Sequence, residues 1–110
     1  MDIGYKNKKL KRIFDSLEAL RGAYGQNGDV IKSRMGFLKA VECLNDVPVM
    51  KPTRRHQLSG DRESQFAVDL KHPFRLIFCP AHDPLPYKED GGIDLIRVRT
   101  ITILGVEDYH

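Results

Sequence analysis

The sequence predicts an α+β fold, with two N-terminal helices packed on a twisted, mostly antiparallel sheet of four or five strands. Three observations lead to this prediction. Residues 65–70 and 74–79 each place a large apolar side chain at every second position, as the two strands of a β-hairpin do. Residues 8–44 repeat their apolar side chains with a helical period. Residues 96–106 are rich in β-branched side chains. Helices that precede a run of strands, without alternating with them, are typical of this fold class.

The hairpin defines the centre of the expected sheet. Six apolar side chains form a ladder along one of its faces: Phe66, Val68, Leu70, Phe74, Leu76 and Phe78. If residues 71–73 are the connecting loop, Leu70 faces Phe74 and the ladder is complete. The same register places Asp69 opposite Arg75 on the other face.

Two amphipathic helices are expected before the hairpin. The first covers residues 8–24 and ends at Gly25, and the second covers residues 30–44. Either Asn27 or Asp29 is suited to cap the second helix. The ladder is expected to meet five helix side chains: Leu10, Ile13, Phe14, Leu17 and Leu38.

Gly36 lies in the middle of the second predicted helix. Glycine there weakens a helix by roughly 1 kcal/mol relative to alanine. Close packing of a neighbouring helix would be a reason for the missing side chain.

Three further segments complete the expected topology. Residues 2–7 are a candidate edge strand, and residues 81–94, rich in Pro, Gly and Asp, are a surface loop. Residues 96–106 carry apolar side chains on both faces, which predicts an interior strand or one with a bulge.

Size and composition fit a single soluble domain over residues 1–110. The chain is 41% apolar and 30% charged, with a net charge of +3 and a pI of about 9.0. This balance favours a nucleic-acid or acidic partner only weakly, so the placement of charge matters more. No apolar run is long enough to cross a membrane, and the first fourteen residues are too charged for a signal peptide, so a cytoplasmic location is expected.

A basic cluster surrounds the hairpin: Arg54, Arg55, His56, Arg62, Lys71 and Arg75. Acidic Asp61, Glu63 and Asp69 are interspersed with it. One interpretation is a solvated sheet face, on which Asp69 neutralises Arg75 across the strands. The other is a phosphate-binding surface, in which arginine forks hold phosphate oxygens. RNA binding through the same residues would be sensitive to salt.

The sequence ends on Asp108, Tyr109 and His110. These residues could be an exposed tail, but they directly continue an apolar strand. A carboxylate, a phenol and an imidazole together are suited to proton transfer and to base stacking.

No metal or cofactor is expected. Cys79 and His82, with His72 nearby, give at most a faint zinc pattern, because no second Cys/His pair follows. Cys43 and Cys79 allow at most one disulfide, and Cys79 is more simply a small buried apolar residue.

The string HQLSGDRESQFAVDLKHPFRLIF, followed by a β-rich segment that ends in VEDYH, resembles the RelE/ParE toxin superfamily. The most similar branch is the HigB-like plasmid maintenance "killer protein". The resemblance covers nearly the whole chain, including the two helices before the sheet. It implies the toxin of a type II toxin–antitoxin system, silenced by an antitoxin that often carries a helix-turn-helix DNA-binding domain. Operator DNA would then be contacted only through the antitoxin.

The same resemblance implies a metal-independent endonuclease (mRNA interferase) that cleaves mRNA in the ribosomal A site and inhibits translation. The expected catalytic residues are Lys71, Arg75, Asp108, Tyr109 and His110. The expected RNA-binding residues are Arg54, Arg55, His56 and Arg62. Ser59 departs from the family's turn, which often carries a functional lysine at this position, so a neighbouring arginine would have to supply the charge. The alternatives are a ParE-type inhibitor of DNA gyrase and a catalytically weakened regulatory member.

Overall fold

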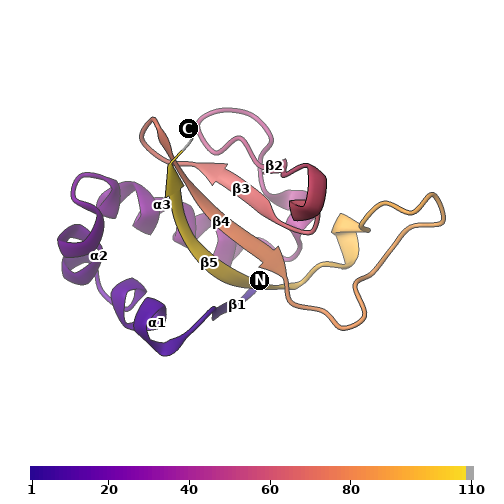
Figure 1. Cartoon of the computed structure of the whole chain (residues 1–110), viewed down its shortest axis with the longest axis horizontal. Helices are drawn as coiled ribbons and strands as arrows, with labels where there is room; N and C mark the ends of the chain where they lie inside the picture. The colour runs from indigo at the N-terminus through magenta and orange to yellow at the C-terminus, as the bar shows by residue number, and fades with distance from the viewer. Residues whose placement is uncertain (109–110) are drawn as a thin grey trace.

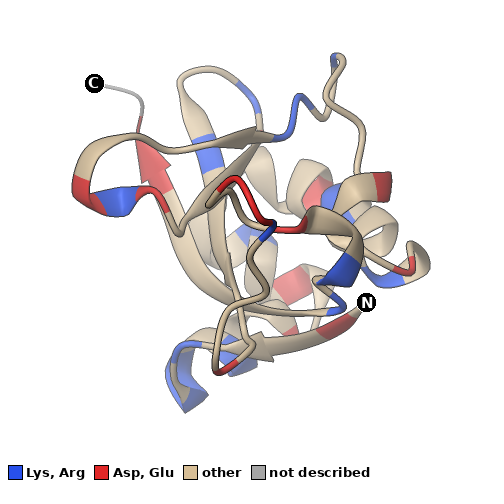
Figure 2. Cartoon of the chain, turned by 90° about the vertical axis from the view of Figure 1, so that its right-hand side faces the viewer, with Lys and Arg blue, Asp and Glu red and all other residues tan. Residues whose placement is uncertain are grey.

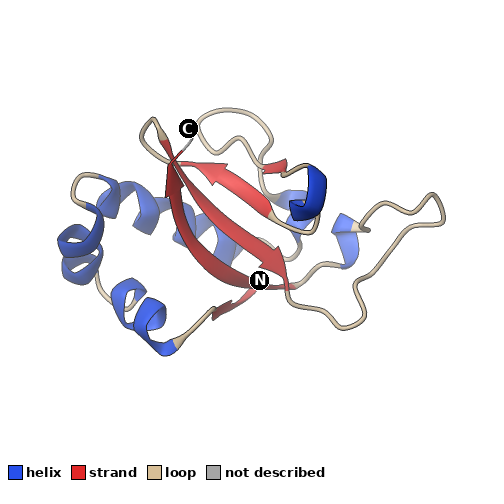
Figure 3. Ribbon diagram, in the orientation of Figure 1, coloured by secondary structure: helices blue, strands red, loops and turns tan. Residues whose placement is uncertain are grey.

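The computed structural model describes residues 1–108, which form three α-helices and a five-stranded sheet (Figures 1 and 3). The helices follow the first strand and precede the other four strands, and they cover one face of the sheet, in agreement with the predicted α+β class. The helices and strands are β1 (Asp2–Tyr5), α1 (Lys8–Phe14), α2 (Leu17–Tyr24), α3 (Asn27–Ala40), β2 (His56–Gln57), β3 (Phe66–Asp69), β4 (Phe74–Pro80) and β5 (Thr100–Asp108). Three short 3₁₀ turns lie between them: Leu44–Asp46, Gly60–Arg62 and Leu95–Arg97.

The strand order in the sheet is β1-β5-β4-β3-β2. β1 pairs with β5 in parallel, and the other three pairings are antiparallel. The predicted edge strand is therefore confirmed in β1. The predicted hairpin register is also confirmed, because Phe66 pairs with Phe78 and Asp69 pairs with Arg75. The stacked rings of Phe66 and Phe78 lie 6.1 Å apart.

β5 begins at Thr100, four residues later than predicted, and Leu95–Arg97 form a 3₁₀ turn instead. β5 is an interior strand and it contains a bulge, so both predicted features of this strand occur together. Ile77 pairs with Gly105 and Phe78 pairs with Ile103, which leaves Leu104 as the extra residue. Gly105 has a φ of +144°, a region that glycine adopts more easily than other residues. Ile101 and Ile103 before the bulge face the helices, and so does Val106 after it. The bulge thus shifts the alternation by one residue.

The single helix predicted over residues 8–24 is wrong, because the chain breaks after Phe14 and restarts at Leu17. Ser16 is extended, and its Oγ accepts a hydrogen bond from the Ala19 amide at 3.0 Å. This cap satisfies an amide that a helix start would leave without a partner. Gly25 ends the second segment as predicted.

The helix predicted over residues 30–44 begins earlier and ends earlier, at Asn27 and Ala40. The Met1 amino group donates to the carbonyls of Leu38 and Lys39, near the C-terminal end of α3. Neither predicted cap is found: Asn27 Oδ1 accepts from the Lys71 amide at 2.8 Å, and Asp29 pairs with Arg21.

The core lies between the helices and the ladder face of the sheet. Phe14 and Leu38 are buried against it as predicted, and Leu10 and Ile13 pack at its margin. Two expectations fail at the ends of this interface. Phe74 is 37% exposed, because it pairs with Asp108 at the rim of the sheet. Leu17 is only half-buried, because it lies just after the helix break.

A second, smaller apolar cluster lies on the other face of the sheet and contains Leu58, Ala67 and Ile77, with Leu104 packed against them. No helix within residues 1–108 has the length and apolar character that crossing a membrane requires.

Candidate nucleic-acid interface

A row of alternating charge crosses the face of the sheet that the helices leave open. Asp69, Arg75 and Glu107 are direct cross-strand neighbours on β3, β4 and β5. Directly opposed side chains share a face, and Asp69 and Arg75 therefore lie with the small Ala67–Ile77 cluster. An arginine is bound at each end, so we call Arg54, Asp69, Arg75, Glu107 and Arg62 the charge row.

Asp69 is held by Arg54. Nε and Nη2 of Arg54 donate to the two carboxylate oxygens of Asp69 at 2.6 and 2.9 Å, a bidentate geometry. Arg34 of α3 adds a hydrogen bond from its Nε to the Asp69 carbonyl at 2.7 Å. The interpretation in which Asp69 neutralises Arg75 is therefore corrected. Among residues 1–108, the carboxylate within ion-pair distance of Arg75 is that of Glu107, at 3.9 Å.

Arg54 has a strained backbone. Its φ of +46° lies in the left-handed region, which residues other than glycine rarely adopt. The amide of Arg54 donates to the Met50 carbonyl, and Thr53 accepts from the Asp69 amide. These contacts, with the ion pair to Asp69, hold the guanidinium at the edge of the row. Such strain tends to occur at functional sites.

Glu107 is shared by two arginines. Nη1 and Nη2 of Arg62 donate to its two oxygens at 2.9 and 2.7 Å, and Arg75 lies on its other side. The hydrogen bonds from Arg62, and then the charges of Arg62 and Arg75, hold the pKa of Glu107 below its ordinary value. Arg62 is oriented further by a hydrogen bond from its Nε to Gln65 at 2.9 Å.

The bulge in β5 is what places Glu107 in the row. Without the extra residue Leu104, the alternation set by Ile101 and Ile103 would turn Glu107 toward the helices. With it, Val106 faces the helices and Glu107 faces Arg75.

Lys71 and Arg55 lie outside the row. Lys71 is at the tip of the β3–β4 hairpin, where its Nζ donates to Gln26 Oε1 at 2.6 Å. Nε of Arg55 donates to the Val47 carbonyl at 3.0 Å, and burial lowers its pKa. Arg55 therefore holds the chain segment before β2.

His56 lies on the open face, because it pairs with Ala67. Its Nδ1 is 2.9 Å from the Arg54 carbonyl oxygen. Since a carbonyl can only accept, Nδ1 is the donor of this hydrogen bond.

Asp108 is the last residue of β5 and pairs with Phe74, so its side chain belongs to the helix side of the rim. Arg75 and Asp108 are thus close along the sheet but project from different faces. The end of β5 lies beside the tip of the hairpin (Figure 1). Tyr109 and His110, both predicted to be catalytic, lie outside the described residues.

The predicted basic surface is not uniformly basic. Figure 2 shows acidic and basic segments interspersed on the side of the molecule that faces the viewer. Three of the predicted cationic residues belong to the charge row: Arg54, Arg62 and Arg75. The row can bind an anion when phosphate oxygens replace carboxylate oxygens in the arginine forks.

The residues of the faint zinc pattern have other roles. Nε2 of His82 accepts from the Arg99 and Thr100 amides at 3.0 and 3.3 Å, which supports the start of β5. Cys43 and Cys79 are free thiols, and Cys79 is only partly buried, less than predicted. In the described part of the chain, no group of three His, Cys, Asp or Glu side chains is placed to hold a metal ion.

Arg34 and Glu107 take part in the site but were not predicted. Arg34 gives no local signal, because its partner is 35 residues away in the sequence. Glu107 directly precedes Asp108 in the sequence, but the face of the sheet from which its side chain projects depends on the bulge.

The sequence matches no protein-family model and no curated protein.

Proposed function

We propose that this chain is an RNA-cleaving toxin of the RelE/HigB kind, which acts on mRNA in the ribosomal A site in the cytoplasm. The observation that supports this most is the charge row. Arg75 lies at its centre, on the open face of the sheet, and its side chain is 17% exposed. An arginine held in this way on a rigid strand is preorganised to receive an anion.

RNA phosphates compete with carboxylates for the same donors. The guanidinium groups of Arg54 and Arg62 each form bidentate hydrogen bonds to the two oxygens of a carboxylate, and a phosphate presents its oxygens in a similar arrangement. In the proposed complex, RNA lies along the open face and its phosphates contact Arg54, Arg62 and Arg75. His56 lies on the same face and contacts the RNA beside them.

The proposed reaction is an internal transfer at phosphorus. The ribose O2′ attacks the adjacent phosphorus, the P–O5′ bond breaks, and a 2′,3′-cyclic phosphate remains. Arg75 stabilises the charge that grows on the phosphoryl oxygens. Lys71 adds to this after its Nζ leaves Gln26, to which it donates at the tip of the hairpin. His110 serves the proton transfer in which the attacking O2′ loses a proton and the leaving O5′ gains one, and Asp108 orients His110. Tyr109 stacks on a base. Negative charge at Asp69 and Glu107 keeps the arginines aligned but opposes RNA binding.

The proposed protein partner is an antitoxin with a helix-turn-helix DNA-binding domain, through which operator DNA is reached. Binding of the antitoxin silences the toxin until the antitoxin is removed.

Mapping of mRNA 5′ ends after a short induction tests the proposal. The wild-type chain is expected to produce new 5′ ends within coding regions, and Arg75→Ala and His110→Ala are expected to abolish them. Growth arrest without new 5′ ends, together with gyrase poisoning by the purified protein, would instead support the ParE-type inhibitor.

A further inference from the structure

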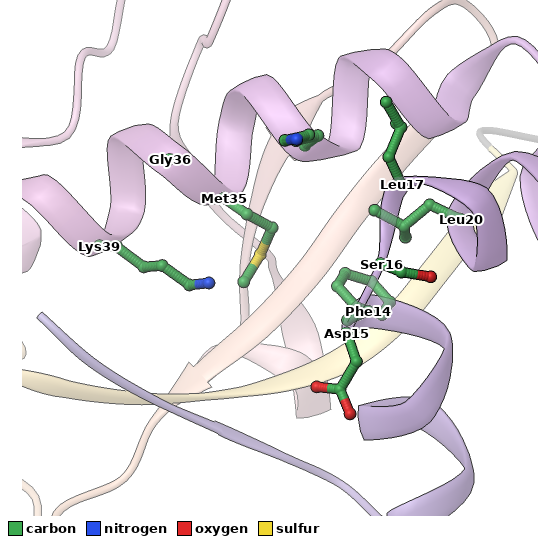
Figure 4. Close-up of a pocket in the computed structure, with 9 residues that line it drawn as sticks. Phe14, Asp15, Ser16, Leu17, Leu20, Met35, Gly36 and Lys39 are labelled. Atoms are coloured by element: carbon green, nitrogen blue, oxygen red, sulfur yellow. The ribbon is translucent and has the colours of Figure 1, made fainter.

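A pocket of about 250 Å³ lies between α3 and the junction of α1 and α2 (Figure 4). Its apolar lining comes from Phe14, Leu17, Leu20 and Met35, and the side chains of Leu17, Leu20 and Met35 are directed into the space between the helices. Small-molecule sites typically enclose about 300–1,000 Å³. This pocket is therefore better matched to one or two inserted apolar side chains than to a larger ligand.

Gly36 of α3 lines the same pocket, and the space beside it is open. A Cβ added at Gly36 would meet no atom within 4 Å. Close helix packing is thus not the reason for this glycine. By contrast, a Cβ at Gly28 would come within 2.7 Å of the Arg21 backbone, so the α2–α3 packing requires that glycine. The helix loses roughly 1 kcal/mol at Gly36 with no internal contact in return, and the result is an accessible pocket.

The exposed rim of the pocket is basic along α3. Lys32 and Lys39 both line it and stand two helical turns apart. Neither lysine takes part in an ion pair among residues 1–108, although Lys32 acts on Asp29 through its charge. The carboxylate on the opposite wall, Asp15, is paired with Lys11 at 3.4 Å.

We infer that this pocket is a docking site for an acidic amphipathic segment of a protein partner. An apolar side chain of the segment enters beside Gly36, and its flanking carboxylates pair with Lys32 and Lys39. The pocket is lined by the helices, whereas the charge row lies on the opposite face of the sheet. The inference therefore does not depend on the proposed reaction, and both surfaces can be occupied at once.

A designed helical peptide tests this inference. It carries leucine at helical spacing with glutamate on both flanks, and a second peptide has lysine in place of every glutamate. Fluorescence anisotropy measures the binding of each labelled peptide to the full chain. The acidic peptide is expected to bind at least tenfold more tightly than the basic one.

Gly22 of α2 provides a matched control for Gly36. It is also an exposed helical glycine with no atom within 4 Å of an added Cβ, but it does not line the pocket. Both Gly22→Leu and Gly36→Leu are expected to raise the melting temperature, because leucine is the better helix former. Only Gly36→Leu is expected to weaken the acidic peptide, by tenfold or more, since its side chain fills the entrance.

A variant with Lys32→Gln and Lys39→Gln provides an independent measurement, with an expected loss of about fivefold. If the acidic peptide were attracted only by the net positive charge of the chain, Gly36→Leu and Gly22→Leu would bind it with equal affinity. That result would overturn the inference, as would equal binding of the two peptides or no binding of the acidic peptide at about 1 mM.

Discussion

Replacing Glu107 by Gln should tighten the proposed RNA binding, because it removes the negative charge that lies between Arg62 and Arg75. The Arg75 Nη2 lies 3.9 Å from a Glu107 oxygen. At this distance Coulomb's law gives an attraction of about 1 kcal/mol between the two charges in water, and a phosphate that binds Arg75 competes with it. The Glu107 side chain is 41% exposed, so screening keeps the energy near this lower limit. A change of about 1 kcal/mol corresponds to roughly fivefold in affinity.

The assay is anisotropy of a short single-stranded RNA over a range of salt concentrations. Glu107→Gln should bind about fivefold more tightly than wild type. Its log–log salt slope should be steeper by about 0.7, because one more phosphate is neutralised. Glu18→Gln is the matched control, since it removes the same charge from the exposed surface of α2, away from the charge row. This variant should change neither quantity.

Weaker RNA binding by Glu107→Gln would refute this reasoning. It would mean that the carboxylate is needed mainly to align the arginines, and that its competition with phosphate is minor. Equal effects of Glu107→Gln and Glu18→Gln would show that only the net charge of the chain matters.

Three further predictions concern stability. Phe78→Ala should lower the free energy of unfolding by about 3–5 kcal/mol in a urea titration, because a fully buried ring is lost. Ser16→Ala should lower it by about 1 kcal/mol through loss of the cap on α2, whereas Ser33→Ala, at an exposed position within α3, should change it little. Because the folded pKa of Glu107 is depressed below 4.5, its ion pairs stabilise the fold above that pH and are lost as the pH falls through the folded pKa. The stability difference between wild type and Glu107→Gln should therefore shrink on acidification from about pH 5 to pH 3, and a constant difference would contradict the pairing.

The hairpin could be predicted from the sequence in detail, because its register depends on local quantities. Alternation assigns Phe66 and Phe78 to the buried face, and a short loop leaves one way to pair them. The class of the fold followed from the order of the periodic segments.

The break between α1 and α2 could not be predicted from periodicity. Phe14, Leu17 and Leu20 continue the helical spacing across it, so the apolar pattern shows no interruption. Ser16 interrupts the helix because its side chain caps the start of α2. A serine within a periodic segment does not by itself indicate such a cap.

The charge pairing of the site was also beyond the sequence pattern. Arg62 and Glu107 are separated by 45 residues, and they meet only because β5 lies beside β4 and contains a bulge. The nearest carboxylate in the hairpin, Asp69, was the natural partner to expect for Arg75. The structure assigns Asp69 to Arg54, whose left-handed backbone no sequence pattern indicated.

Cleavage of mRNA on purified, programmed ribosomes tests the central proposal most directly. Under single-turnover conditions, Arg75→Ala is expected to reduce the cleavage rate by about a hundredfold or more, while circular dichroism shows an intact fold. Arg75→Lys should recover part of the rate, since it keeps the charge and loses the fork. Cleavage by Arg75→Ala at the wild-type rate, or no cleavage by the wild-type protein, would contradict the assignment of the open sheet face as the RNA site.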